Sequence, residues 1–188
     1  MQISYPEIGI CGLSCRLGPR YHTKGTSRCG GCKGSFRMGA GCPFITCAVK
    51  KKGIEFCWQC KENEACERWA KRREWGRYHD SFTCYQTLED NIAFIQRNGI
   101  AKFRASQRIR EKLLREMISS FNEGRSKTYY CIAAAVLKIE ELKAALAKAR
   151  TQSAGLDTKG RSMVLHALLD NVAEGKQIRL TLRKKMVV

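Results

Sequence analysis

The sequence predicts a mainly α-helical protein in which a small, irregular Cys-rich module precedes a helical bundle. Nine of the 11 cysteines lie in the first 66 residues, where apolar side chains show little helical periodicity. From about residue 62 onward, apolar side chains recur every three or four residues, as in amphipathic helices. We therefore expect a Cys-rich metal-binding module over residues 1–75 and a helical bundle domain over residues 76–188.

Composition and charge exclude several classes of protein. An apolar fraction of 44% in 188 residues permits a core and argues against disorder. No apolar run approaches the roughly 18 residues that span a bilayer, and the N-terminus lacks the features of a secretory signal. We therefore expect a cytoplasmic protein with reduced thiols and no membrane partner. The formal net charge is +18, which two four-thiolate zinc sites would lower to about +14.

The first cysteines come in pairs separated by two to four residues, the spacing that lets two thiolates reach one ion. The pairs are Cys11 and Cys15, Cys29 and Cys32, Cys42 and Cys47, and Cys57 and Cys60. These eight ligands suffice for two four-coordinate sites. They combine either sequentially, with the first two pairs forming one site, or in an interleaved scheme. Cys66 is a ninth candidate that can replace one of the later set, and His22 is a further candidate near the first site.

Two kinds of metal centre fit these ligands. The Cys-Gly-Gly-Cys-Lys-Gly segment at 29–34 is similar to a zinc knuckle, and this spacing favours two zinc ions. Cys42-Pro43 and the run Cys57, Cys60 and Cys66 are similar to ferredoxin-type ligation, so a [4Fe–4S] cluster is the alternative. Buried apolar cysteines and a disulfide framework explain the paired spacing less well.

The order of these motifs resembles that of a known family. The matching segments are Cys11-Gly12-Leu13-Ser14-Cys15, Cys29-Gly30-Gly31-Cys32-Lys33, Cys42 with Cys47-Ala48, and Cys57, Cys60 and Cys66-Glu67. Over residues 9–75 the chain resembles the Cys-rich family called domain of unknown function 3795. Gly18 stands where many members have a third early Cys, and Ala65 where they have Pro. The resemblance implies a metal-binding module and no established reaction.

The remainder of the chain predicts a series of helices. We expect helices over residues 65–75, 88–98 with Thr87 as N-cap, a following segment ending near residue 122, 129–150 and 158–175, then a short strand or extended tail over 178–182. In the helix ending near residue 122, Ile109, Leu113, Met117 and Phe121 are predicted to face inward. Cys131 and His166 are expected in the core, and Cys84 as a free thiol near His79.

These observations predict a metal-binding protein without assigning it a reaction. The first hypothesis is a scaffold ordered by two zinc ions that presents the basic helical half to a protein partner. The alternative is an iron–sulfur protein for electron transfer or accessory redox chemistry in anaerobic metabolism. A nucleic-acid-binding regulator is the second alternative; it is less favoured because no recognition motif accompanies the basic clusters. No catalytic constellation is recognised, which leaves enzymatic activity open.

Overall fold

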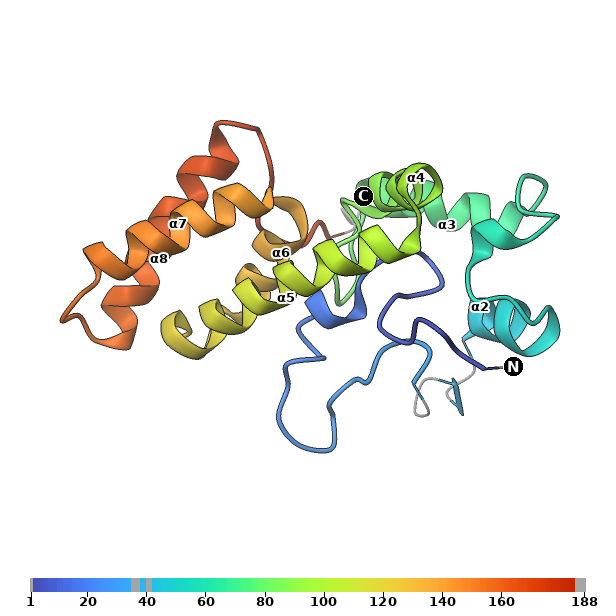
Figure 1. Cartoon of the computed structure of the whole chain (residues 1–188), viewed down its shortest axis with the longest axis horizontal. Coiled ribbons are helices and arrows are strands. Elements are labelled where there is room, and N and C mark those ends of the chain that lie inside the picture. Colours follow the sequence, from blue (N-terminus) through green and yellow to red (C-terminus); the bar gives the residue numbers. More distant parts are fainter. Residues whose placement is uncertain (1, 35–37, 40–41, 185–188) are drawn as a thin grey trace. The chain divides into compact units, whose positions relative to one another are not determined.

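The computed structural model describes residues 2–34, 38–39 and 42–184. The protein is mainly helical, as the sequence predicts, and the described part contains seven α-helices and no strand (Figure 1). The elements are η1 (Cys15–Leu17), α2 (Pro43–Ile45), η2 (Thr46–Lys51), η3 (Cys57–Gln59), α3 (Glu67–Tyr78), α4 (Leu88–Asn98), α5 (Ile100–Phe121), α6 (Lys127–Val136), α7 (Ile139–Gln152) and α8 (Thr158–Glu174). None of the described helices combines the length and apolar character needed to cross a bilayer.

The chain forms two compact units that divide inside α5. Unit 1 comprises Met1–Arg104 with Arg183–Val188, and unit 2 comprises Ala105–Leu182. This division lies later than the change in composition near residue 75. Helices α3 and α4 belong with the cysteines because Trp69 and Leu88 share a buried cluster with Leu13 of the N-terminal segment.

The described residues of unit 1 form three small apolar clusters instead of one large core. They are Leu13, Trp69, Tyr85, Leu88 and Ile92; Ile8, Phe56, Ile95 and Phe103; and Ile10, Ile45, Ala48 and Val49. Cysteines pack against the edges of two of these clusters, with Cys11 and Cys66 beside the first and Cys32 and Cys42 beside the third. Clusters of this size bury little apolar surface, so unit 1 depends on additional interactions for its stability.

A buried ion pair fixes the C-terminal segment to unit 1. The carboxylate of Asp80 has no solvent exposure and accepts hydrogen bonds from the Arg183 backbone N–H at 2.8 Å and from its Nη2 at 2.9 Å. Burial alone would raise the pKa of Asp80, but the hydrogen bonds from Arg183 and the Tyr85 N–H lower it. Arg183 Nη2 also donates to the carbonyl of Gly76 at 2.9 Å, near the C-terminal end of α3.

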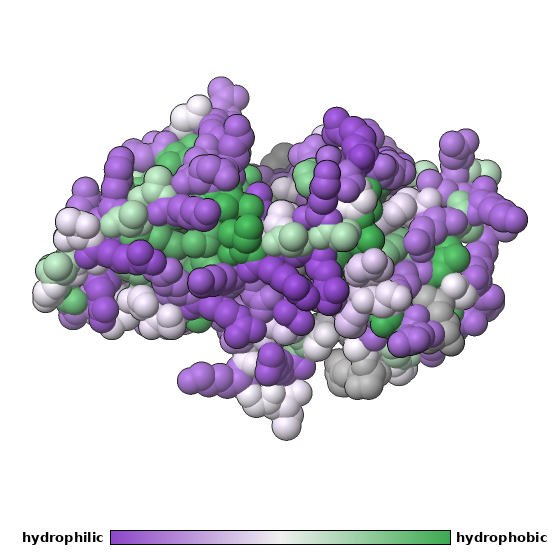
Figure 2. Space-filling model, in the orientation of Figure 1, coloured by the Kyte–Doolittle hydropathy of each residue, from purple (hydrophilic) through white to green (hydrophobic). Residues whose placement is uncertain are grey.

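Unit 2 is helical, and α7 packs along α8 (Figure 1). Its fully buried side chains include Tyr130 of α6, Leu142 and Leu146 of α7, and Leu165 and Leu169 of α8. Hydrophilic side chains cover much of the visible face, and hydrophobic atoms gather around α6 and α7 (Figure 2). Unit 2 therefore has a conventional apolar interior, unlike unit 1.

The single helix expected from Tyr129 to about Arg150 is wrong, because the chain is interrupted between α6 and α7. Leu137 and Lys138 are extended, with ψ angles of 156° and 151°. Arg110 of α5 donates from Nη1 to the carbonyls of Ala134 at 2.7 Å and Leu137 at 2.6 Å. These bonds satisfy carbonyls that the end of α6 leaves without helical partners.

Two smaller expectations for unit 2 also change. Ile109 is 43% exposed instead of facing inward, and Leu114 takes a buried place on α5 with Met117 and Phe121. Residues 178–182 form no strand; this segment is an extended tail in which Leu180 is buried. The helices expected over 88–98 and 158–175 are confirmed as α4 and α8 within one residue.

We predict that Arg183→Met destabilises unit 1 by about 3 kcal/mol, because it leaves the buried Asp80 carboxylate without its guanidinium partner. Denaturant unfolding monitored by tryptophan fluorescence measures this loss, since Trp58, Trp69 and Trp75 all lie in unit 1. The exposed Lys184 provides a matched control as Lys184→Met. Equal unfolding midpoints for both variants and the wild type would contradict the role given to Arg183.

Candidate metal centre

A tight loop at the N-terminus brings the thiols of Cys11 and Cys32 close to the same glycine. Residues 8 and 14 form an antiparallel β-bridge, and the Gly9 N–H donates to the carbonyl of Leu13 at 2.8 Å. The Gly12 N–H donates to the carbonyl of Gly9 at 3.0 Å and closes the tip of the loop. A side chain on Gly9 would place its Cβ 3.3 Å from Cys11 Sγ and 3.4 Å from Cys32 Sγ. Both thiols therefore lie directly against the loop backbone.

Two glycines are required for this arrangement. Gly12 has a φ of +84°, and a Cβ there would lie 3.2 Å from the ring of Trp58. Gly31, between Cys29 and Cys32, has a φ of +101°, and a Cβ there would lie 3.3 Å from the Cβ of Cys15. Only glycine fits a left-handed backbone at such close approach. The Cys-Gly-Gly-Cys segment can thus pass close to Cys15.

The first group of thiols comprises Cys11, Cys15, Cys29 and Cys32, which all line one cavity of about 90 Å³. Cys15 and Cys32 are hydrogen-bonded to each other, and this bond raises the pKa of Cys15 and lowers that of Cys32. Burial, together with the charge of nearby Cys32, raises the pKa of Cys11 to about 11. These four cysteines are the first site of the sequential scheme.

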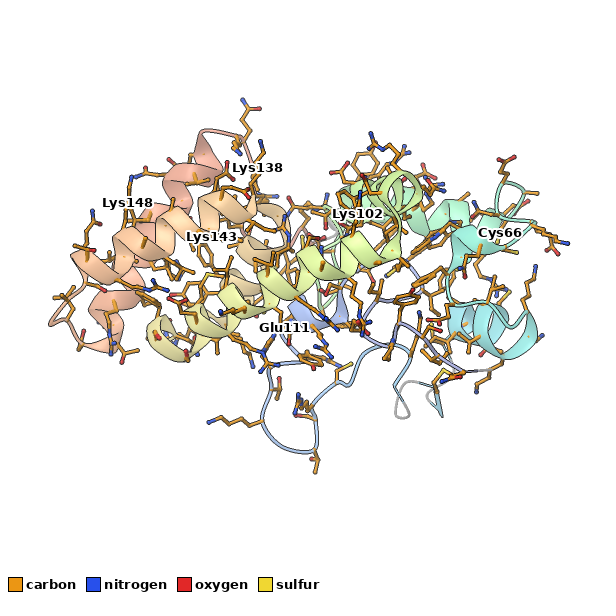
Figure 3. The ribbon with its side chains drawn as sticks, viewed as in Figure 1. Cys66, Lys102, Glu111, Lys138, Lys143 and Lys148 are labelled. Carbon is orange, nitrogen blue, oxygen red and sulfur yellow. The ribbon has the colours of Figure 1, made fainter. Side chains whose placement is uncertain are left out.

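The second group comprises Cys47, Cys57, Cys60 and Cys66, which line a larger cavity of about 300 Å³. Cys47 lies in η2, Cys57 opens η3, Cys60 follows η3, and Cys66 precedes the first residue of α3 (Figure 3). Burial, together with the charges of nearby cysteines, raises the pKa of Cys57 to about 12. Cys66 thus lines this cavity with three members of the later set.

Cys42 lies in a different position from the other candidates. It directly precedes Pro43 at the start of α2 and lines a third cavity, of about 220 Å³, together with Cys11, Cys32 and Cys57. The second group therefore differs from the sequential scheme, in which Cys42 and Cys47 act as a pair. Within the described residues, no group of three or more His, Cys, Asp or Glu side chains lies close enough together to hold a metal ion.

A buried ion pair, which the sequence analysis missed, joins the two groups. Lys33 follows Cys32, and its Nζ donates to Glu55 Oε2 at 2.7 Å and to the carbonyl of Tyr5 at 3.2 Å. The Lys33 side chain has no solvent exposure, and its ammonium lies 3.9 Å from the centre of the Phe56 ring. Glu55 lies two residues before Cys57 and also accepts hydrogen bonds from the N–H groups of Ser4 and Tyr5. This pair holds three segments of unit 1 in register.

A second lysine contacts a thiol directly. Lys52 Nζ donates to Cys60 Sγ at 3.1 Å and forms an ion pair with Glu62 at 2.7 Å. Its hydrogen bonds with Glu62 and Cys60 raise the pKa of Lys52 above its ordinary value. The Lys52 ammonium thus places a positive charge beside the Cys60 sulfur. The sequence contains a signal for this contact only in the basic run at 50–52.

The other cysteines and the histidines play structural parts. Cys84 and Cys131 are buried, and burial raises their pKa values to about 11 and 12, which suits core thiols. His79 contacts the carbonyl of Trp75 through Nδ1 at 3.3 Å, and His22 contacts that of Arg16 through Nε2 at 2.7 Å. His166 is half-buried and hydrogen-bonded to Ser126 Oγ at 2.7 Å.

The donor set suits a thiophilic metal. All 11 cysteines are free thiols, and eight of them line two cavities in groups of four. Adjacent thiolates repel each other electrostatically. A cation among them replaces this repulsion with attraction, because each thiolate becomes its ligand. Four thiolates are the usual ligand set of structural zinc and of iron–sulfur clusters.

We predict that Lys33→Met destabilises unit 1 by about 3 to 5 kcal/mol, because it leaves the Glu55 carboxylate buried without a counter-charge. Loss of the pair separates the segment after Cys32 from the segment before Cys57, so metal retention falls as well. Denaturant unfolding followed by tryptophan fluorescence, with metal analysis of the native fraction, measures both effects. The exposed Lys24 provides the control Lys24→Met. Wild-type stability in Lys33→Met would show that the ion pair does not hold unit 1 together.

No protein-family model, curated protein or solved structure matches the chain.

Proposed function

We propose that this chain is a cytoplasmic metal-binding protein with two thiolate centres in unit 1. The first centre uses Cys11, Cys15, Cys29 and Cys32, and the second uses Cys47, Cys57, Cys60 and Cys66. The observation that carries the proposal is that eight thiols line two cavities, four at each. The third cavity, lined by Cys42, takes its other three cysteines from these two groups. The order of the motifs, which resembles that of the Cys-rich family named above, supports the same conclusion.

Zinc is the metal that we propose for the first centre. Its cavity is small, and Cys15 and Cys32 are already close enough to hydrogen-bond. A zinc ion binds thiolates at about 2.3 Å in a tetrahedron, which places the sulfurs about 3.8 Å apart. The glycines at 30 and 31 leave the backbone free to turn around such an ion. These features support a closed structural site in which zinc has no open coordination position.

We propose that each unit presents its own basic surface to an acidic protein partner, and that the centres order the surface of unit 1. Lys50 and Lys51 are exposed at the end of η2, and Arg68 and Lys71 are exposed on α3. In unit 2, three further lysines are exposed at the start of α7 and along it: Lys138, Lys143 and Lys148 (Figure 3). Surfaces with this density of positive charge attract acidic partners and lose affinity as salt is added.

We predict that Cys32→Ser removes one zinc ion per chain and unfolds part of unit 1, because a serine hydroxyl does not replace a thiolate ligand. Helices α6 to α8 keep their circular dichroism signal, since their apolar core lies in unit 2. Metal analysis of the purified variant, together with tryptophan fluorescence, provides the measurement.

The control is Cys131→Ala, which removes a buried thiol of α6 that belongs to neither group. It should retain the full metal content. A Cys32→Ser variant with the metal content of the wild type, or a wild-type chain that purifies without zinc and iron, would contradict the proposed function.

A further inference from the structure

The two thiol groups of unit 1 differ in size. The cavity of the first group has a volume of about 90 Å³, and that of the second about 300 Å³. We propose that the second group, Cys47, Cys57, Cys60 and Cys66, binds a [4Fe–4S] cluster and not a zinc ion. This inference rests on the proposed function and assigns different cofactors to the two centres.

The larger cavity has room for a cofactor that brings atoms of its own. A single zinc ion draws four thiolates to about 3.8 Å from one another and leaves no cavity among them. A cubane cluster places four iron atoms and four sulfides between its ligands, so the cysteines stand further apart. A cavity of about 300 Å³ whose lining includes four cysteines, together with Phe44 and Trp69, fits the second case better.

The ligands also approach the cavity from separate elements. Cys57 and Cys60 flank the turn η3, Cys66 precedes α3, and Cys47 comes from η2. Three of them are close in sequence and the fourth is more distant, a division that is common among cluster ligands. The first group differs, because its four cysteines converge on one small cavity at a loop tip and a Cys-Gly-Gly-Cys turn.

A buried hydrogen-bond donor without a partner supports a cofactor with exposed sulfur atoms. Trp69 is 3% exposed and lines the cavity, and its Nε1–H has no hydrogen-bond partner within the described part of the chain. A buried donor without a partner is costly, and cluster sulfides and thiolates accept hydrogen bonds. Lys52 Nζ already donates to Cys60 Sγ at 3.1 Å. Both donors stabilise the more negative, reduced cluster.

Cys42 is excluded from this centre by its position. It lines the neighbouring cavity, which shares Cys57 with this centre, and not the cavity lined by Cys47, Cys60 and Cys66. The spacing of Cys42 and Cys47 alone does not distinguish a ligand from a neighbouring thiol. Cys42 therefore serves as the matched cysteine control for the second centre.

The first test is the metal content of the full chain purified without oxygen. We expect about four iron atoms and four acid-labile sulfides with one zinc ion per chain, and a brown colour with a broad visible absorption band. Two zinc ions per chain without sulfide would overturn this inference and leave the proposed function standing. A chain with neither zinc nor iron would overturn both.

Matched cysteine variants assign the cofactors to their groups. Cys66→Ser should lose iron and sulfide and retain zinc, whereas Cys29→Ser should lose zinc and retain the cluster. Cys42→Ser should retain both. Iron retained in Cys66→Ser, or lost only in Cys42→Ser, would overturn the ligand assignment. If a variant fails to fold, the wild-type content of iron, sulfide and zinc still decides between a cluster and a second zinc ion.

The reduction potential of the cluster in the intact protein tests whether Trp69 and Lys52 donate hydrogen bonds to cluster sulfur. Trp69→Phe and Lys52→Met should each lower the potential, because each removes a hydrogen-bond donor from cluster sulfur. Lys61→Met is the control, since Lys61 is exposed, adjoins Cys60 in the sequence, and should leave the potential unchanged. A redox titration followed by electron paramagnetic resonance provides the readout. Unchanged potentials in both donor variants would overturn the placement of the cluster beside Trp69 and Lys52.

Discussion

The crowding of half-buried thiols determines how unit 1 is built. Each of the three apolar clusters contains only four or five buried side chains, and cysteines pack against the edges of two of them. Thiols in such groups cannot all ionise unless a cation lies among them. If unit 1 binds metal as we propose, metal binding and folding of this unit are one thermodynamic event, because the same thiols serve as ligands and as packing.

Two buried ion pairs connect the backbone segments that carry the thiols of unit 1. The Lys33–Glu55 pair connects the segment after Cys32 with the segment before Cys57, and both side chains are largely removed from water. The Asp80–Arg183 pair does the same for the end of α3 and the C-terminal segment. Buried pairs of this kind contribute modestly to stability, but their loss is costly, so they specify position more than they add free energy.

The spacing of the cysteines predicted which residues line the candidate site better than it predicted which cysteines share a cavity. Paired cysteines at two to four residues can share an ion wherever the chain turns, and the structure brings Cys11, Cys15, Cys29 and Cys32 to one cavity. Whether Cys42 or Cys66 joins the later cysteines depends on how α2 and α3 begin, and spacing does not encode this. The contact between Lys33 and Glu55 spans 22 positions and follows no sequence pattern.

Local sequence patterns also locate some helices and miss a break that depends on distant residues. Caps and periodicity located α4 and α8 because their signals lie within a few residues. The break at Leu137 and Lys138 has no Gly or Pro to mark it, and the carbonyls it frees are satisfied by Arg110, 24 and 27 positions earlier. Such a break is determined by tertiary contacts, and a periodic apolar run conceals it.

X-ray absorption at the zinc and iron edges measures whether sulfur atoms of unit 1 coordinate metal in the native protein. We expect each absorbing metal to have a first coordination shell of sulfur alone, at about 2.3 Å. A first shell of nitrogen and oxygen, or a native chain whose first cysteines form disulfides and hold no metal, would contradict this expectation.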